Sequence, residues 1–142
     1  MSGLLGTHAG LVQDITLVLQ ISIMFLLGFG YYLVRKKHIQ NHGVITTIAL
    51  LLHTSNILLT MLPSFMNILN ASFDGLSFGV MVTYIHGILG IVAEMLGLWV
   101  VINWRFQSIV LCAKRKVFMK VTFVSWFLSL ILGITFYAYY YI

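Results

Sequence analysis

The sequence predicts an all-α integral membrane protein in which four helices form an antiparallel, up-and-down bundle. Of its 142 residues, 61% are hydrophobic and only 8% are charged, whereas a soluble domain carries roughly 25% charged residues. This length accommodates four apolar helices of about 20 residues each, joined by short connections. All eight Lys and Arg residues fall in two short clusters, separated by apolar sequence. Together these features predict a single transmembrane domain over residues 1–142.

The two basic clusters predict the orientation of the helices. One cluster occupies residues 35–37 and the other lies within residues 105–120. Lys and Arg concentrate in cytoplasmic loops, and two loops separated by two membrane crossings lie on the same side. We therefore expect loops 35–42 and 105–116 in the cytoplasm and both termini outside. Because the basic residues flank apolar segments instead of forming a stripe, the net charge of +5 does not indicate nucleic-acid binding.

Apolar segments and their polar flanks predict where the helices begin and end. We expect helices over residues 11–34, 43–69, 78–104 and 117–140. Pro63 lacks a backbone N–H donor, so a bend is expected one turn earlier, near Thr60. Asp74-Gly75 is a turn signal between the second and third helices. Residues 1–10 contain no Lys or Arg, so they lack the basic start of a signal peptide and the first helix is expected to be retained.

Every predicted helix carries polar or small residues spaced mostly three or four apart, which places them on one face. In helix order they are Gln13, Thr16, Gln20, Gly28 and Tyr31; His42, Thr46, Ala49, His53, Asn56, Thr60 and Asn67; Thr83, His86, Gly90, Glu94 and Gly97; and Thr122, Ser125, Ser129 and Gly133. We predict that these faces line a shared interior. Opposite faces, such as the one with Ile48, Leu51 and Leu58, are expected to contact lipid.

Two histidines inside the predicted helices form the candidate site, because an ionisable residue at membrane depth is a candidate functional residue. His53 is expected about 15 Å from the inner side and His86 about 12 Å from the outer side, which is near one level in a core of about 30 Å. Imidazole is a suitable ligand for both haem iron and copper. His53 and His86 are therefore candidate haem or copper ligands, and His42, at the inner boundary, is a further candidate metal ligand.

Glu94 is expected to be the only carboxylate inside the membrane, and it joins the candidate site. Three roles are open for the Glu94 side chain. It could relay protons, pair with a cation of a partner subunit, or be protonated and bond a neighbouring helix. The residues alone are equally compatible with no cofactor at all. His53 would then bond across the bundle, a contact worth about 0.6 kcal/mol on average.

Motifs for hydrolytic catalysis are lacking in this chain. Ser125 and Ser129 have no His and Asp partners at a suitable spacing, and neither H-E-x-x-H nor C-x-x-C occurs. We therefore predict a protein that is not an enzyme.

Several motifs between about residues 31 and 140 occur in an order typical of one protein family. They are Arg35-Lys36-Lys37-His38, His42-Gly43, Tyr84-Ile85-His86-Gly87, Trp104-Arg105, and Thr122, Phe123, Trp126, Gly133 and Tyr137. In these motifs the chain resembles a family of small four-helix bacterial and archaeal membrane proteins that includes maturation factors of haem-copper cytochrome oxidase. The resemblance implies a role in haem-copper oxidase assembly. It also implies that His53, His86 and Glu94 handle haem or copper, with His42 as an entry-side ligand.

Two alternatives to a maturation factor stay open. The family tends to carry another histidine before the fourth helix, where this chain has Ala113-Lys114-Arg115-Lys116. That difference favours a non-catalytic accessory subunit of a larger membrane oxidase or copper-dependent membrane monooxygenase. The other alternative is a small b-type cytochrome, with a haem held between His53 and His86.

Overall fold

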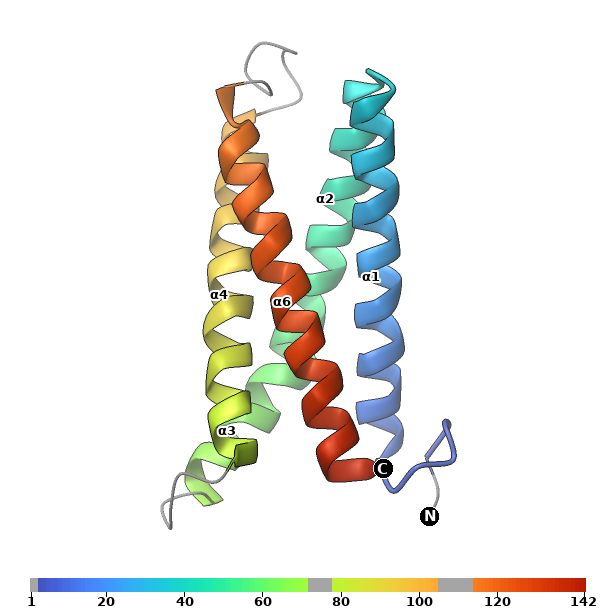
Figure 1. Cartoon of the computed structure of the whole chain (residues 1–142), viewed down its shortest axis with the longest axis vertical. Coiled ribbons are helices and arrows are strands. Elements are labelled where there is room, and N and C mark those ends of the chain that lie inside the picture. Colours follow the sequence, from blue (N-terminus) through green and yellow to red (C-terminus); the bar gives the residue numbers. More distant parts are fainter. Residues whose placement is uncertain (1–2, 72–77, 105–113) are drawn as a thin grey trace.

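The structure, a computed structural model, describes residues 3–71, 78–104 and 114–142 (Figure 1). Its helices are α1 (Leu11–Arg35), α2 (Ile39–Asn56), the π-helical segment η1 (Ile57–Met61), α3 (Leu62–Ala71), α4 (Phe78–Trp104) and α6 (Lys116–Tyr141). Four segments, α1, α2 continued into α3, α4 and α6, are long and apolar enough to cross a membrane. The predicted all-α bundle of four apolar segments is confirmed, and it marks a multi-pass membrane protein.

The two ends of the bundle differ in charge. Figure 1 shows α1 ending and α6 beginning at one end, which we call the basic end because it carries residues 35–37 and 114–116. Both chain termini lie at the opposite end, which we call the terminal end. The two basic clusters therefore meet at one end, as far as the described residues reach. Residues 105–113 of the predicted loop 105–116, and the turn signal Asp74-Gly75, lie outside those residues.

The connection between α1 and α2 is shorter than the sequence predicts. Lys37 adopts a left-handed backbone conformation, with φ of 65°. The backbone N–H groups of Lys37 and His38 bond the Val34 and Leu33 carbonyls, at 3.1 and 3.0 Å. This tight turn satisfies carbonyls that a helix end leaves free. Helix α2 begins at Ile39 as a result, and His42 lies inside its first turns and not in a loop.

The bend predicted near Thr60 is confirmed as a change of helix type. Residues Ile57–Met61 form η1, just before Pro63. A π-helical turn and a proline are two known causes of a helix bend. Figure 1 shows the consequence: α2 runs beside α1 at the basic end, and α3 turns toward α4 at the terminal end.

The bundle consists of two helix pairs that meet in a small core. Helix α1 packs mainly on α2, and α4 mainly on α6. The core between the pairs is formed by Ile23, Leu27, Ala49, Leu50, Ala93 and Trp126. The predicted lipid-facing residues Leu51 and Leu58 are exposed. Gly28 and Tyr31, predicted on the inner face of the first helix, are also exposed, because helix rotation is set by packing and not by spacing alone.

Gly97 marks a close approach of α4 to its neighbours and supplies a first prediction. A Cβ atom there would lie 2.9 Å from Leu50 Cδ1, whereas one at Gly28 would meet nothing within 4 Å. Gly97→Leu is therefore expected to lower the free energy of unfolding by about 1–3 kcal/mol through overpacking. Gly28→Leu is the matched control and is expected to be neutral or stabilising. Thermal unfolding of both variants in detergent measures the difference, and equal melting temperatures would contradict the close approach.

Candidate functional site

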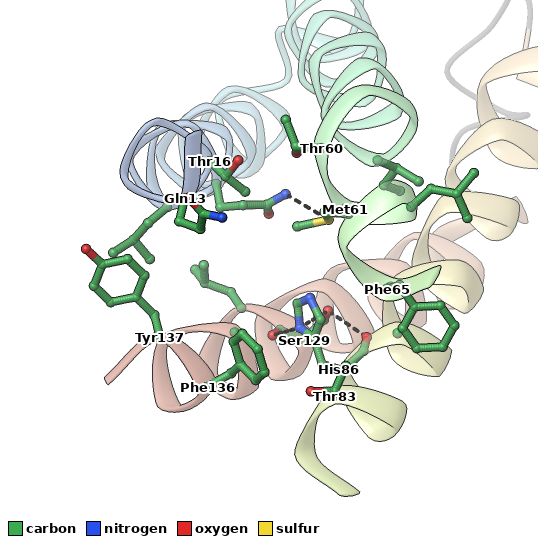
Figure 2. Close-up of a pocket in the computed structure, with 18 of the residues that line it drawn as sticks. Gln13, Thr16, Thr60, Met61, Phe65, Thr83, His86, Ser129, Phe136 and Tyr137 are labelled. Atoms are coloured by element: carbon green, nitrogen blue, oxygen red, sulfur yellow. Dashed lines mark hydrogen bonds between the residues drawn. The ribbon is translucent and has the colours of Figure 1, made fainter. Parts of the chain in front are cut away.

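A cavity of about 450 Å³ lies between the helices in the half of the bundle nearer the terminal end. All four membrane-spanning segments contribute to its walls, which are mainly apolar. Its polar lining residues are Gln13, Thr16, Gln20, His53, Thr60, Asn67, Thr83, His86 and Ser129, several of which are labelled in Figure 2. Two predicted site residues, His53 and His86, therefore reach the same cavity.

His86 is held by α6 in a defined tautomer. Its Nδ1 lies 2.7 Å from the Ser129 carbonyl oxygen, and the Ser129 hydroxyl donates to the His86 carbonyl at 3.1 Å. A carbonyl only accepts hydrogen bonds, so Nδ1 carries the proton. A Cβ atom at Gly133 would lie 3.1 Å from the ring, so that glycine provides the room. In the neutral ring Nε2 keeps a free lone pair, and no described group bonds it.

His53 is buried, with 2% of its surface exposed, and it pairs with Glu94. Its Nδ1 lies 2.6 Å from Glu94 Oε2, while the Thr54 hydroxyl bonds Oε1 of the same carboxyl group. The ring edge packs on Trp126, with ring centroids 4.6 Å apart. Glu94 thus links α4 to α2, as in the predicted alternative in which this side chain bonds a neighbouring helix. As with His86, no described group bonds the His53 Nε2.

The expected common level of His53 and His86 needs a correction. His53 lies beside Glu94, which is eight residues along α4 from His86, or about 12 Å of helix rise. Residue counts from helix ends give the relative depth of two side chains only when the helices are straight and parallel. Here α2 begins four residues earlier than predicted and bends at η1. The two rings share a cavity, but each is fixed by its own partner.

His42 lies apart from this cavity. Its Nδ1 bonds the Gly30 carbonyl at 2.8 Å, which joins α2 to α1 toward the basic end. It is not among the cavity-lining residues. Over residues 3–71, 78–104 and 114–142, no group of three or more His, Cys, Asp or Glu side chains is arranged to hold a metal. Of the predicted metal ligands, only His53 and His86 line the cavity.

Besides Arg115 Nη1, three buried polar atoms inside the bundle have no hydrogen-bond partner within the described part of the chain. They are Thr16 Oγ1, Asn56 Nδ2 and Trp126 Nε1. Thr16 lines the cavity, and Trp126 packs on His53. Buried polar groups are normally bonded, so these atoms mark places where a water molecule or a polar group of a ligand fits.

A second buried carboxylate was missed by the sequence analysis, which expected Glu94 to be the only one. Asp14, in the first turn of α1, is fully buried. It accepts the backbone N–H of Leu5 at 2.9 Å and the hydroxyl of Tyr137. The Thr7 hydroxyl lies 2.7 Å from the Tyr137 oxygen. These bonds tie residues 3–10 to the end of α6. An acidic residue in a first helical turn was the available signal, since that end of a helix favours negative charge.

Comparisons of the chain with protein-family models, with curated proteins and with solved structures found no match. The resemblance to the oxidase maturation family therefore stays a prediction that rests on the motifs in the sequence.

Proposed function

We propose that this chain helps to assemble, or accompanies, a membrane redox complex, and that it handles haem or copper at His53 and His86 without being an enzyme itself. The observation that carries the proposal is the bonding of the two imidazoles. Each ring holds its Nδ1 on a fixed acceptor, Glu94 or the Ser129 carbonyl, and leaves Nε2 without a described partner. Histidines that bind metals almost always bond a carboxylate or a carbonyl through their other nitrogen.

The donor chemistry and the walls suit either group at each histidine taken by itself. Imidazole binds copper and is a common axial ligand of haem iron, and the mainly apolar walls suit a macrocycle. When bound, the metal would supply the redox chemistry, while Glu94 and Ser129 orient the two rings. The distribution of Lys and Arg supports placing the basic end in the cytoplasm. The cavity and both termini would then be nearer the outer side.

Removal of either imidazole is expected to weaken cofactor binding. We expect the chain, purified in mild detergent with whatever co-purifies, to show a haem band or stoichiometric copper. His53→Ala and His86→Ala should each lose at least about tenfold in affinity, the low end of what removing a supporting group costs. His38→Ala, at an exposed position outside the cavity, is the matched control. Absorption spectra and metal analysis measure the cofactor content of each variant. Unchanged content in His86→Ala would overturn the assignment of His86 as a ligand.

An accessory subunit is the second candidate, and one observation favours it. His53 and Glu94 satisfy each other across α2 and α4, as a purely structural pair would. Such a subunit would stay in stoichiometric complex with an oxidase or a copper-dependent monooxygenase. It would contain no cofactor of its own and would tolerate His86→Ala. A maturation factor would be absent from the finished enzyme. A b-type cytochrome would keep a reversible haem spectrum as an isolated chain.

A further inference from the structure

The cavity opens toward the lipid-facing surface of the bundle. Several side chains that line it are also strongly exposed, among them Leu62, Tyr84, Ile88 and Ile91. Ile88 and Ile91 on α4 are 60% and 61% exposed. In a membrane-spanning helix such apolar side chains face acyl chains. A molecule dissolved in the bilayer can therefore reach the cavity between α3 and α4 without crossing water.

The polar groups that matter for a ligand lie on two opposite walls of the cavity, one formed by α4 and the other by α1. His86 offers a bare Nε2, which only accepts a hydrogen bond while its proton is held on the Ser129 carbonyl. Figure 2 shows Gln13 and Thr16 on α1, across the cavity from His86. The Thr16 hydroxyl is buried and has no partner in the described part of the chain. Leaving buried polar groups unpaired is costly, so the best ligand brings a hydroxyl to His86 and a second polar atom to α1.

We propose that the cavity binds the head group of a lipid-soluble hydroquinone in its reduced form. Such a head group is a flat, apolar ring with hydroxyl groups at opposite edges. One O–H donates to His86 Nε2, and the second is available to the polar side chains of α1. The ring itself packs among Phe65, Leu130 and Phe136 in the cavity wall. The oxidised quinone has only acceptor oxygens, so it loses the bond to His86. Binding alone is proposed, with no electron transfer.

This proposal goes beyond the haem or copper role and does not require it. A metal on His86 Nε2 would compete with the hydroquinone for the same lone pair. Metal-free protein therefore gives the clean test. Metal binding without a preference for hydroquinone would contradict the hydroquinone proposal and leave the metal proposal standing. A preference for hydroquinone without metal binding would support the hydroquinone proposal and contradict the metal proposal.

The experiment compares three forms of one decyl-substituted benzoquinone with the full, metal-free chain in phosphatidylcholine nanodiscs under anaerobic conditions. They are the hydroquinone, the quinone and the hydroquinone dimethyl ether, which cannot donate. Ligand retained above that in protein-free nanodiscs is measured. The hydroquinone is expected to bind at least about tenfold more tightly than its ether, because the ether leaves His86 Nε2 unpaired. Equal affinity for the two would overturn the proposal.

Variants test how much His86 and Thr16, on the two walls of the cavity, contribute to the binding of hydroquinone. His86→Phe is expected to remove the preference for hydroquinone over ether, and Thr16→Val to weaken hydroquinone binding by a smaller factor. His38→Phe, at an exposed position outside the cavity, is expected to change neither. If His86→Phe does not fold, the proposal is still tested by Thr16→Val and by the affinities of the unaltered chain for the three ligands. A preference that persists in folded His86→Phe would overturn the role of His86.

Discussion

Glu94→Ala is expected to destabilise the bundle by about 1–3 kcal/mol for each buried group that loses its hydrogen-bond partner. The substitution leaves His53 inside α2 with only 2% of its surface exposed and without its 2.6 Å partner. It also removes the acceptor of the Thr54 hydroxyl. The free energy of unfolding in mixed detergent micelles measures the loss. An ordinary interhelical hydrogen bond in a membrane averages about 0.6 kcal/mol, so a total loss no larger than that would show that His53 and Thr54 do not depend on Glu94.

A double-mutant cycle separates this pair from general damage. His53→Ala, Glu94→Ala and the double variant are expected to show a coupling of about 0.5–3 kcal/mol, as for residues in direct contact. Glu94→Gln should retain part of the stability, because an amide still bonds both neighbours. Ser55→Ala is the matched control on α2, since that exposed hydroxyl bonds the Leu51 carbonyl of its own helix. Additive effects of His53→Ala and Glu94→Ala would exclude the pairing.

Asp14→Ala is expected to release residues 3–10 from the terminal end of the bundle. The change leaves the Leu5 N–H without its acceptor and removes one of two partners of the Tyr137 hydroxyl, which keeps Thr7. The unpaired N–H costs about 1–3 kcal/mol. The effect should be local, because these bonds join only that segment, α1 and α6. Hydrogen exchange of the Leu5 amide is expected to accelerate by at least about tenfold, which corresponds to roughly 1.4 kcal/mol. Amides in the middle of α1 should change less.

Two comparisons check that the carboxylate itself is responsible. Tyr137→Phe removes one bond to Asp14 but keeps the Leu5 contact, so it should give a smaller acceleration. Thr135 is exposed on α6, and its hydroxyl bonds the Ile131 carbonyl of the same helix. Thr135→Val should therefore leave the exchange unchanged. Equal exchange at Leu5 in Asp14→Ala and the unaltered chain would show that the segment is held by other contacts, such as the His8 N–H bond to the Tyr141 carbonyl.

Features that depend on local sequence could be predicted well. The four apolar segments, the disturbance before Pro63 and the meeting of the basic clusters at one end all follow from hydrophobicity, backbone chemistry and the alternation of helix direction. The inward placement of His53, His86 and Glu94 follows from spacing along each helix. These predictions succeed because an amphipathic period and a missing N–H group are properties of a few neighbouring residues.

The pairing of these side chains was decided by the tertiary structure. Spacing placed His53 opposite His86, but the bend at η1 and the packing of α2 on α4 bring it to Glu94. The tautomer of His86 depends on a carbonyl of α6, 43 residues away in sequence. Asp14 was missed because its partner Tyr137 lies 123 residues away. The sequence by itself determined the four apolar segments and the inward placement of residues such as His53 and Glu94. Exact rotation, and the partners across helices, depend on tilt and depth, which are set only when all the helices pack together.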